Sequence, residues 1–121
     1  MSSRVVDVTL NYKKSTKKLR GFSSIDHALR LMMIDFGFNV TSRSDRIFID
    51  EISHVEIWEM RVPKRGGGAS SGYRMLVVRV LDTDTVFLDR VWDRKDLNKP
   101  KIKSEYQTYL KKLKDASSDF A

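Results

Sequence analysis

Cysteine is absent from the 121-residue sequence, and histidine occurs only twice. The lack of cysteine excludes disulfide bonds, thiol nucleophiles and thiolate zinc sites. The two histidines, His27 and His54, lie far apart in the sequence and show no metal-ligand spacing. We therefore expect neither a metal site nor a bound cofactor.

Long apolar runs are missing as well. No run approaches the roughly 20 residues that a membrane-spanning helix needs. The opening stretch, MSSRVVDVTL, lacks the apolar core of a signal peptide. These two absences predict a cytoplasmic protein with no membrane partner.

The chain has a marked excess of positive charge. It carries 23 Lys and Arg against 16 Asp and Glu, a formal net charge of +7. Its length fits a single domain, residues 1–121, and its balance of 40% hydrophobic and 32% charged residues is that of a globular protein. The charge favours an acidic partner, either nucleic acid or an acidic protein, and a basic surface kept for solubility is the alternative.

A Gly- and Ser-rich loop and a tight turn divide the middle of the chain into strands. The loop spans Pro63–Gly72, and its composition predicts a flexible connector. Two apolar runs follow, Tyr73–Leu81 and Val86–Trp92, separated by the turn formers of Asp82–Asp84. Runs of this kind around a short turn predict two antiparallel neighbouring strands.

Pairing about that turn brings basic residues together. If Leu81 faces Thr85, Arg74 lies opposite Trp92 and Arg94 lies at the same end of the sheet. The preceding apolar run ends at Arg61, just before the Gly-rich loop, so a second hairpin would bring it to that end too. Six cations from three segments are therefore predicted to converge there: Arg61, Lys64, Arg65, Arg74, Arg94 and Lys95.

The N-terminal third reads as a strand, a basic segment and a helix. Arg4–Tyr12 alternates loosely and predicts a strand with one buried face. Lys13–Arg20 is strongly basic and is either a helical turn or a loop. From Ser23 onward apolar residues recur at helical spacing, which predicts an amphipathic helix ending at Gly37 with His27 on its surface.

The remaining segments complete an α+β domain. Thr41–Arg46 is turn-like, Ile47–Ile49 is a short candidate strand, and Val55–Val62 is a strand. A basic amphipathic helix follows Pro100, and the tail 115–121 is expected to fray. The predicted fold is a small antiparallel or mixed sheet of about four strands with an N-terminal helix packed on it and a C-terminal helix.

Three short motifs stand in an order that resembles a known family. They are Trp58-Glu59-Met60-Arg61-Val62, Ser71-Gly72-Tyr73-Arg74 and Trp92-Asp93-Arg94-Lys95. Their succession over residues 55–96 is similar to the RelE/HigB branch of the RelE/ParE toxin superfamily, the toxins of type II toxin–antitoxin systems. The rest of the chain resembles that branch only in its architecture.

The resemblance implies a small basic toxin with a RelE-like fold. Such a toxin cuts messenger RNA in the ribosomal decoding site without a metal, inhibits translation, and is held inactive by a cognate antitoxin. Arg74 matches the arginine of the family's G-Y-R motif, and Arg61 and Arg94 look like its basic positions on the flanking strands. For the family's further catalytic tyrosine or acid, the candidates are Tyr106, Tyr109 and Asp93.

Metal-free cleavage of RNA needs a base, a way to stabilise the charged phosphorus centre, and an acid. Arginine stays protonated, so its role is to stabilise charge. We assign Arg61 and Arg74 to the phosphate, Arg94 to the leaving group, and Lys95 or Asp93 to the base. Further RNA contacts are assigned to basic residues outside this set: Lys17, Lys18, Lys64, Arg65, Lys111 and Lys112.

Three other functions fit the same residues. A ParE-like toxin would poison a topoisomerase by protein contact. A non-catalytic nucleic-acid-binding module would need only the charge, and its binding would weaken steeply with salt. In an interaction protein the arginines would form salt bridges with nearby acids: Asp82, Asp89, Asp93 and Asp96.

Overall fold

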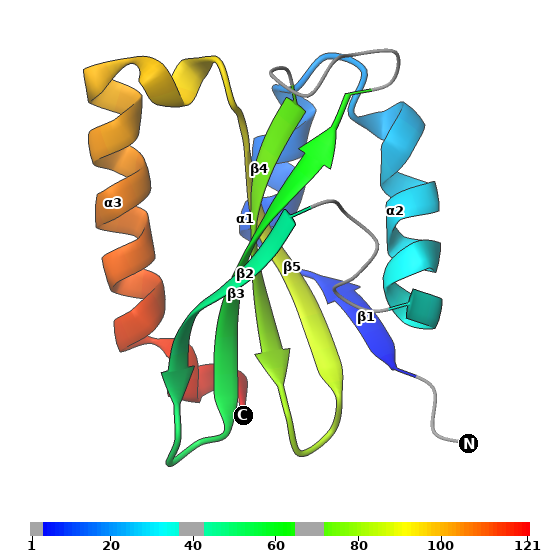
Figure 1. Cartoon of the computed structure of the whole chain (residues 1–121), viewed down its shortest axis with the longest axis vertical. Helices are drawn as coiled ribbons and strands as arrows, with labels where there is room; N and C mark the ends of the chain where they lie inside the picture. The colour runs from blue at the N-terminus through cyan, green and yellow to red at the C-terminus, as the bar shows by residue number, and fades with distance from the viewer. Residues whose placement is uncertain (1–3, 37–42, 65–71) are drawn as a thin grey trace.

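A five-stranded sheet forms the centre of the molecule (Figure 1). The computed structural model describes residues 4–36, 43–64 and 72–121. The strands are β1 Val5–Val8, β2 Arg43–Asp50, β3 Val55–Pro63, β4 Gly72–Val80 and β5 Thr85–Asp93. The helices are α1 Leu10–Lys17, α2 Ser23–Phe36 and α3 Pro100–Asp115, with short 3-10 turns at Asp96–Asn98 and Ser117–Phe120.

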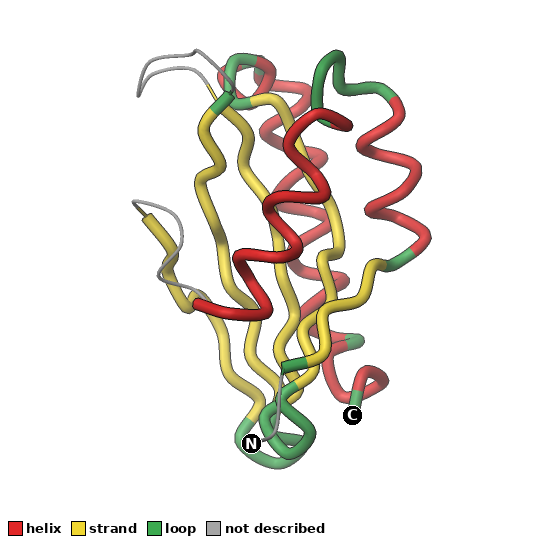
Figure 2. The backbone as a smooth tube through the Cα atoms, turned by 90° about the vertical axis from the view of Figure 1, so that its right-hand side faces the viewer, coloured by secondary structure: helices red, strands yellow, loops and turns green. Residues whose placement is uncertain are grey.

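The strand order is β1-β5-β4-β3-β2, with β1 parallel to β5 and every other pair antiparallel. Figure 2 shows α2 crossing in front of the strands and α3 running behind them. The α+β class predicted from the sequence is confirmed, although the sheet has five strands where about four were expected. The sheet is mixed because β1 pairs in parallel with the edge of β5 that does not face β4.

Both faces of β4 are buried, as its nearly continuous apolar sequence requires. Met75 and Val77 pack with α1 and α2, whereas Leu76 and Val78 pack with α3. All four side chains are fully buried. Neighbouring residues of a strand point to opposite faces, so position along β4 decides which helix layer a side chain meets.

The N-terminal strand is shorter than predicted. It ends at Val8, and the Thr9 hydroxyl then accepts a hydrogen bond from the backbone N–H of Tyr12. A threonine in this position caps a helix by satisfying one of its open N–H groups. The basic segment therefore continues as helix α1, and the buried Tyr12 anchors that helix on the sheet.

Strand β2 is longer than its apolar run. It begins at Arg43 and pairs with β3 along its length, with a bulge between Arg46 and Phe48. The preceding polar residues were predicted to form a turn, and the part from Arg43 onward is instead strand. An edge strand can be polar because one of its sides is not covered by a neighbour.

A bulge sets the register of the β4–β5 hairpin. Next to the turn Val80 pairs with Thr85, one residue away from the pairing expected from the sequence. The register then shifts between Leu76 and Val77, which leaves Asp89 as an extra residue on β5. Beyond the bulge Arg74 lies opposite Trp92, as predicted.

The C-terminal tail, residues 115–121, was expected to fray but is largely ordered. Ser117–Phe120 forms a 3-10 turn in which Ser117 is buried, and the Phe120 ring centroid lies 5.4 Å from that of Phe87. Phe120 is partly buried near the end of α3, and this hydrophobic contact holds the otherwise polar segment against the sheet. In the described part of the chain, no helix has both the length and the apolarity to cross a membrane.

Gly72, the first residue of β4, has no room for a side chain. A Cβ atom at this position would lie 2.7 Å from the carbonyl oxygen of Val62 on β3. We expect Gly72→Ala to lower the free energy of unfolding by about 1–3 kcal/mol, because the two strands must move apart. Denaturant unfolding would measure it, with the exposed Lys111→Ala as control; equal stability of the two variants would contradict the prediction.

Candidate active site at one end of the sheet

A cavity of about 390 Å³ lies between the sheet and the first turns of α3. It is at the end of the sheet where β4 begins and β5 ends, the upper end in Figure 1. Basic and polar side chains form most of its wall. The lining residues are Arg74, Arg94, Leu97, Asn98, Lys103, Tyr106 and Gln107.

The backbone brings the three predicted arginines to this end. Arg61 on β3 pairs directly with Arg74 on β4, and the backbone N–H of Arg94 donates to the Gly72 carbonyl at 2.9 Å. Arg74 shares the α3 face of β4 with Leu76. The predicted convergence of these arginines is therefore present, and the catalytic roles assigned to them stay predictions.

A tyrosine in the cavity wall, Tyr106, and a carboxylate just outside that wall, Glu59, complete the site. Glu59 lies two residues before Arg61 on β3, so both occupy the same face of the strand. One Glu59 carboxylate oxygen accepts a hydrogen bond from the Tyr106 hydroxyl, and the other lies 3.7 Å from Arg74 Nε. Arg74 Nε is buried and has no hydrogen-bond partner among the described residues. Arg74 also lines the cavity, so its positive charge lies next to any anion bound there.

The surroundings of Tyr106 keep its hydroxyl protonated. Burial raises the pKa of Tyr106 far above its ordinary value, and the hydrogen bond to Glu59 and the negative charge of Glu59 raise it further, against a smaller opposing effect of Arg74. The ring is fixed by an edge-on contact with Trp92, whose centroid lies 4.9 Å away. Tyr106 can therefore hold a proton next to the arginines at neutral pH.

Asp93 and Lys95, the predicted bases, do not line this cavity. Asp93 pairs with Tyr73, one residue out of phase with Arg74, and so lies toward the other face. Its carboxylate accepts hydrogen bonds from Lys64 Nζ at 2.7 Å and from the Lys95 backbone N–H at 3.1 Å. Burial raises the pKa of Asp93, but these bonds and the charges of the two lysines outweigh it and hold the pKa below its usual range. Asp93 is an ionised partner of Lys64.

The described residues predicted to contact RNA lie in three separate parts of the chain. Lys64 is engaged with Asp93, and Arg65 lies outside the described residues. Lys17 and Lys111 are exposed on α1 and α3. Lys18 and Lys112 line a hollow on the opposite flank of α3 from Arg74. These lysines therefore do not form a single patch with the arginines.

Sequence reasoning missed Glu59 as a member of the site. The pattern Glu59-x-Arg61 could have indicated it, because this spacing places a carboxylate and a guanidinium on the same face of one strand. Tyr106 was named as a candidate, and its packing against the sheet now places it beside Glu59. Within the described ranges, no group of three or more His, Asp or Glu side chains is arranged to hold a metal ion.

Comparison with protein families, with curated proteins and with solved structures gave no significant match.

Proposed function

We propose that the chain is a metal-independent endoribonuclease that cuts messenger RNA and inhibits translation as the toxin of a toxin–antitoxin pair. The observation that carries this is a cavity lined by three cations and a tyrosine, Arg74, Arg94, Lys103 and Tyr106. The Glu59 carboxylate lies beside this cavity, bound to the Tyr106 hydroxyl and 3.7 Å from Arg74 Nε. Such a set supplies the charge stabilisation, base and acid that RNA cleavage requires.

Each group takes one part in the reaction. The Glu59 carboxylate accepts the proton of the ribose 2′-hydroxyl, whose oxygen attacks the adjacent phosphorus. Arg74 and Arg94 stabilise the negative charge on the phosphoryl oxygens. Tyr106 gives its proton to the departing 5′ oxygen and recovers one from Glu59 through the hydrogen bond that joins them. The products are a 2′,3′-cyclic phosphate and a free 5′-hydroxyl.

The proposed partners follow from the charge. A net charge of +7 favours messenger RNA and ribosomal RNA in the cytoplasm. Control of such an activity needs an antitoxin protein that covers the cavity, and acidic side chains on that protein would complement Arg74, Arg94 and Lys103.

Induced expression in a sensitive bacterium tests the function. We expect the native chain to stop growth and to create new 5′ ends inside translated frames, and we expect Arg74→Ala to do neither. Lys101→Ala, an exposed position on α3 outside the cavity lining, is the matched control and should behave as the native chain. Circular dichroism of the purified variants would establish that both are folded.

The other outcomes separate the rival functions. Growth arrest with intact messages would overturn the nuclease and favour a topoisomerase poison. Absence of arrest, with salt-sensitive binding of uncut RNA by the purified chain, would favour a non-catalytic binding module.

A further inference from the structure

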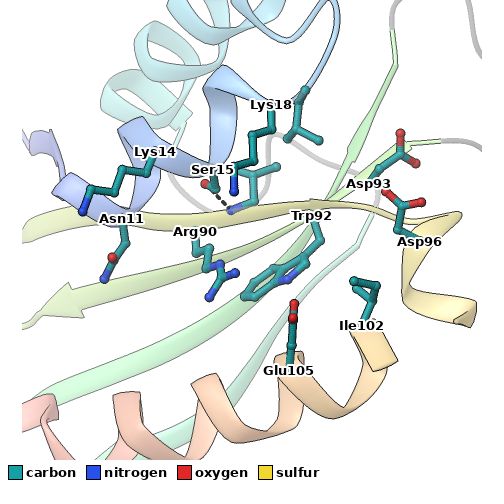
Figure 3. Close-up of a pocket in the computed structure, with 12 residues that line it drawn as sticks. Asn11, Lys14, Ser15, Lys18, Arg90, Trp92, Asp93, Asp96, Ile102 and Glu105 are labelled. Carbon is teal, nitrogen blue, oxygen red and sulfur yellow. Dashed lines mark hydrogen bonds between the residues drawn. The ribbon is translucent and has the colours of Figure 1, made fainter. Parts of the chain in front are cut away.

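A second cavity, of about 420 Å³, lies on the other flank of α3, between α1, β5 and α3 (Figure 3). Arg90 and Trp92 of β5 form its floor. Lys14 of α1, Lys18 just after α1, and Glu105 of α3 line its sides. A neighbouring hollow shares three of these residues, Lys18, Arg90 and Glu105. The proposed reaction uses none of the five residues.

The charges in this cavity are only partly neutralised. Two of its three acids are already engaged, Asp93 with Lys64 at 2.7 Å and Asp96 with Lys99 at 3.1 Å. Across the described residues, Glu105 has no ion pair within 4 Å, and neither have the three cations of the cavity, Lys14, Lys18 and Arg90. Arg90 and Glu105 therefore face one cavity without binding each other.

Aromatic rings hold Arg90 in place. The carbon of its guanidinium lies 4.7 Å from the ring centroids of both Trp92 and Tyr109. An arginine fixed by two rings loses less freedom when it binds a ligand. The indole Nε1 of Trp92 is buried without a hydrogen-bond acceptor among the described residues, and Figure 3 shows the Glu105 carboxylate pointing from α3 toward the Trp92 ring. The cavity thus presents the Arg90 guanidinium on β5 and the Glu105 carboxylate on α3.

We propose that this cavity binds a guanine nucleotide of the RNA substrate. The Arg90 fork donates to the O6 and N7 atoms of guanine, the most frequent arginine–base contact. The Glu105 carboxylate accepts from the N1–H and N2–H groups of the same base. Lys14 and Lys18 bind its phosphate. Guanine is the base that offers two adjacent acceptors beside two adjacent donors, so it bridges Arg90 and Glu105 where the other bases leave one of them unpaired.

The position of the cavity suits an RNA strand that also enters the candidate active site. Trp92 lines this cavity and Tyr106 lines the other, and their ring centroids are 4.9 Å apart. Assignment to an RNA residue rests on the proposed nuclease function. A free guanine nucleotide would present the same base and phosphate, so binding must be measured with both.

Calorimetric titration tests the proposal in the Arg74→Ala protein, in which RNA stays uncut. We expect GMP to bind at least about tenfold more tightly than AMP, CMP or UMP. A short RNA containing guanosine should bind more tightly than GMP, and one without guanosine should not. Glu105→Gln should abolish the preference for guanine, because the amide cannot accept from both N1–H and N2–H.

A matched pair on α1 tests the phosphate contact. Lys14→Ala should weaken the binding of all four nucleotides to the same extent. Lys13 is exposed on the same helix and lies outside the cavity, so Lys13→Ala should leave this binding unchanged. Equal binding of the four nucleotides, or a guanine preference that survives in Glu105→Gln, would overturn the proposal. GMP bound more tightly than guanosine-containing RNA would overturn the assignment to an RNA residue.

Failure of this proposal can be distinguished from failure of the proposed function. If the native chain cuts messages but binds the four nucleotides equally, the guanine site is overturned and the nuclease function is retained. If it binds guanine selectively but cuts no message, the nuclease function is overturned and the guanine site is supported.

Discussion

Replacing Glu59 with glutamine is expected to slow cleavage of translated messages by about 10²–10⁴-fold. The amide has nearly the shape of the carboxylate but cannot accept the proton of the 2′-hydroxyl. The substitution also removes the negative charge next to Arg74, while the amide oxygen can still accept the hydrogen bond of the Tyr106 hydroxyl. Binding of RNA should be retained, because the arginines of the cavity are intact.

Single-turnover cleavage on programmed ribosomes, together with a binding titration, would measure this effect. Asp115→Asn is the matched control, since it removes one exposed carboxylate at the far end of α3. A variant that binds RNA and cuts it at the native rate would show that Glu59 is not the base. Loss of binding together with cleavage would indicate that Glu59 acts by positioning Arg74.

The meeting of the arginines could be predicted because it depends on local pairing. Arg61 and Arg74 flank one loop, and a tight turn sets Arg74 opposite Trp92. The sequence shows both the alternation along each strand and the length of the turn. It does not show the bulge at Asp89. The register at the far end agrees with the prediction because the bulge offsets a one-residue error at the turn.

The pairing of Glu59 with Tyr106 could not be predicted, because these residues are 47 positions apart. Helical spacing predicted that this segment is an amphipathic helix, and Tyr106 lies on its buried side. No local pattern fixes where that helix crosses the sheet. Asp93 was named as one of the candidate bases. The alternation of strand faces places it with Tyr73 instead, where Lys64 binds it.

Tyr106→Phe is expected to reduce cleavage by about 10²-fold or more, because the proton donor to the leaving oxygen is lost. Stability should fall by about 1–3 kcal/mol, since the partly buried Glu59 carboxylate loses a donor. Tyr12→Phe is the matched control: its buried hydroxyl donates to the Asp26 carboxylate, far from the cavity. The control should lose comparable stability and keep the native cleavage rate.

The pH dependence of stability gives a second readout for Tyr106. Burial first, and then Glu59, raise its pKa in the folded chain above the ordinary value of 10.0. A group whose pKa is raised on folding contributes stability that is fully present below its unfolded pKa and is lost as the pH rises through the folded pKa. The difference in unfolding free energy between native chain and Tyr106→Phe should therefore stay constant below about pH 9 and change only at higher pH. Denaturant titrations across this range would measure it, and a difference that already shrinks near neutral pH would show that Tyr106 ionises too early to act as the acid.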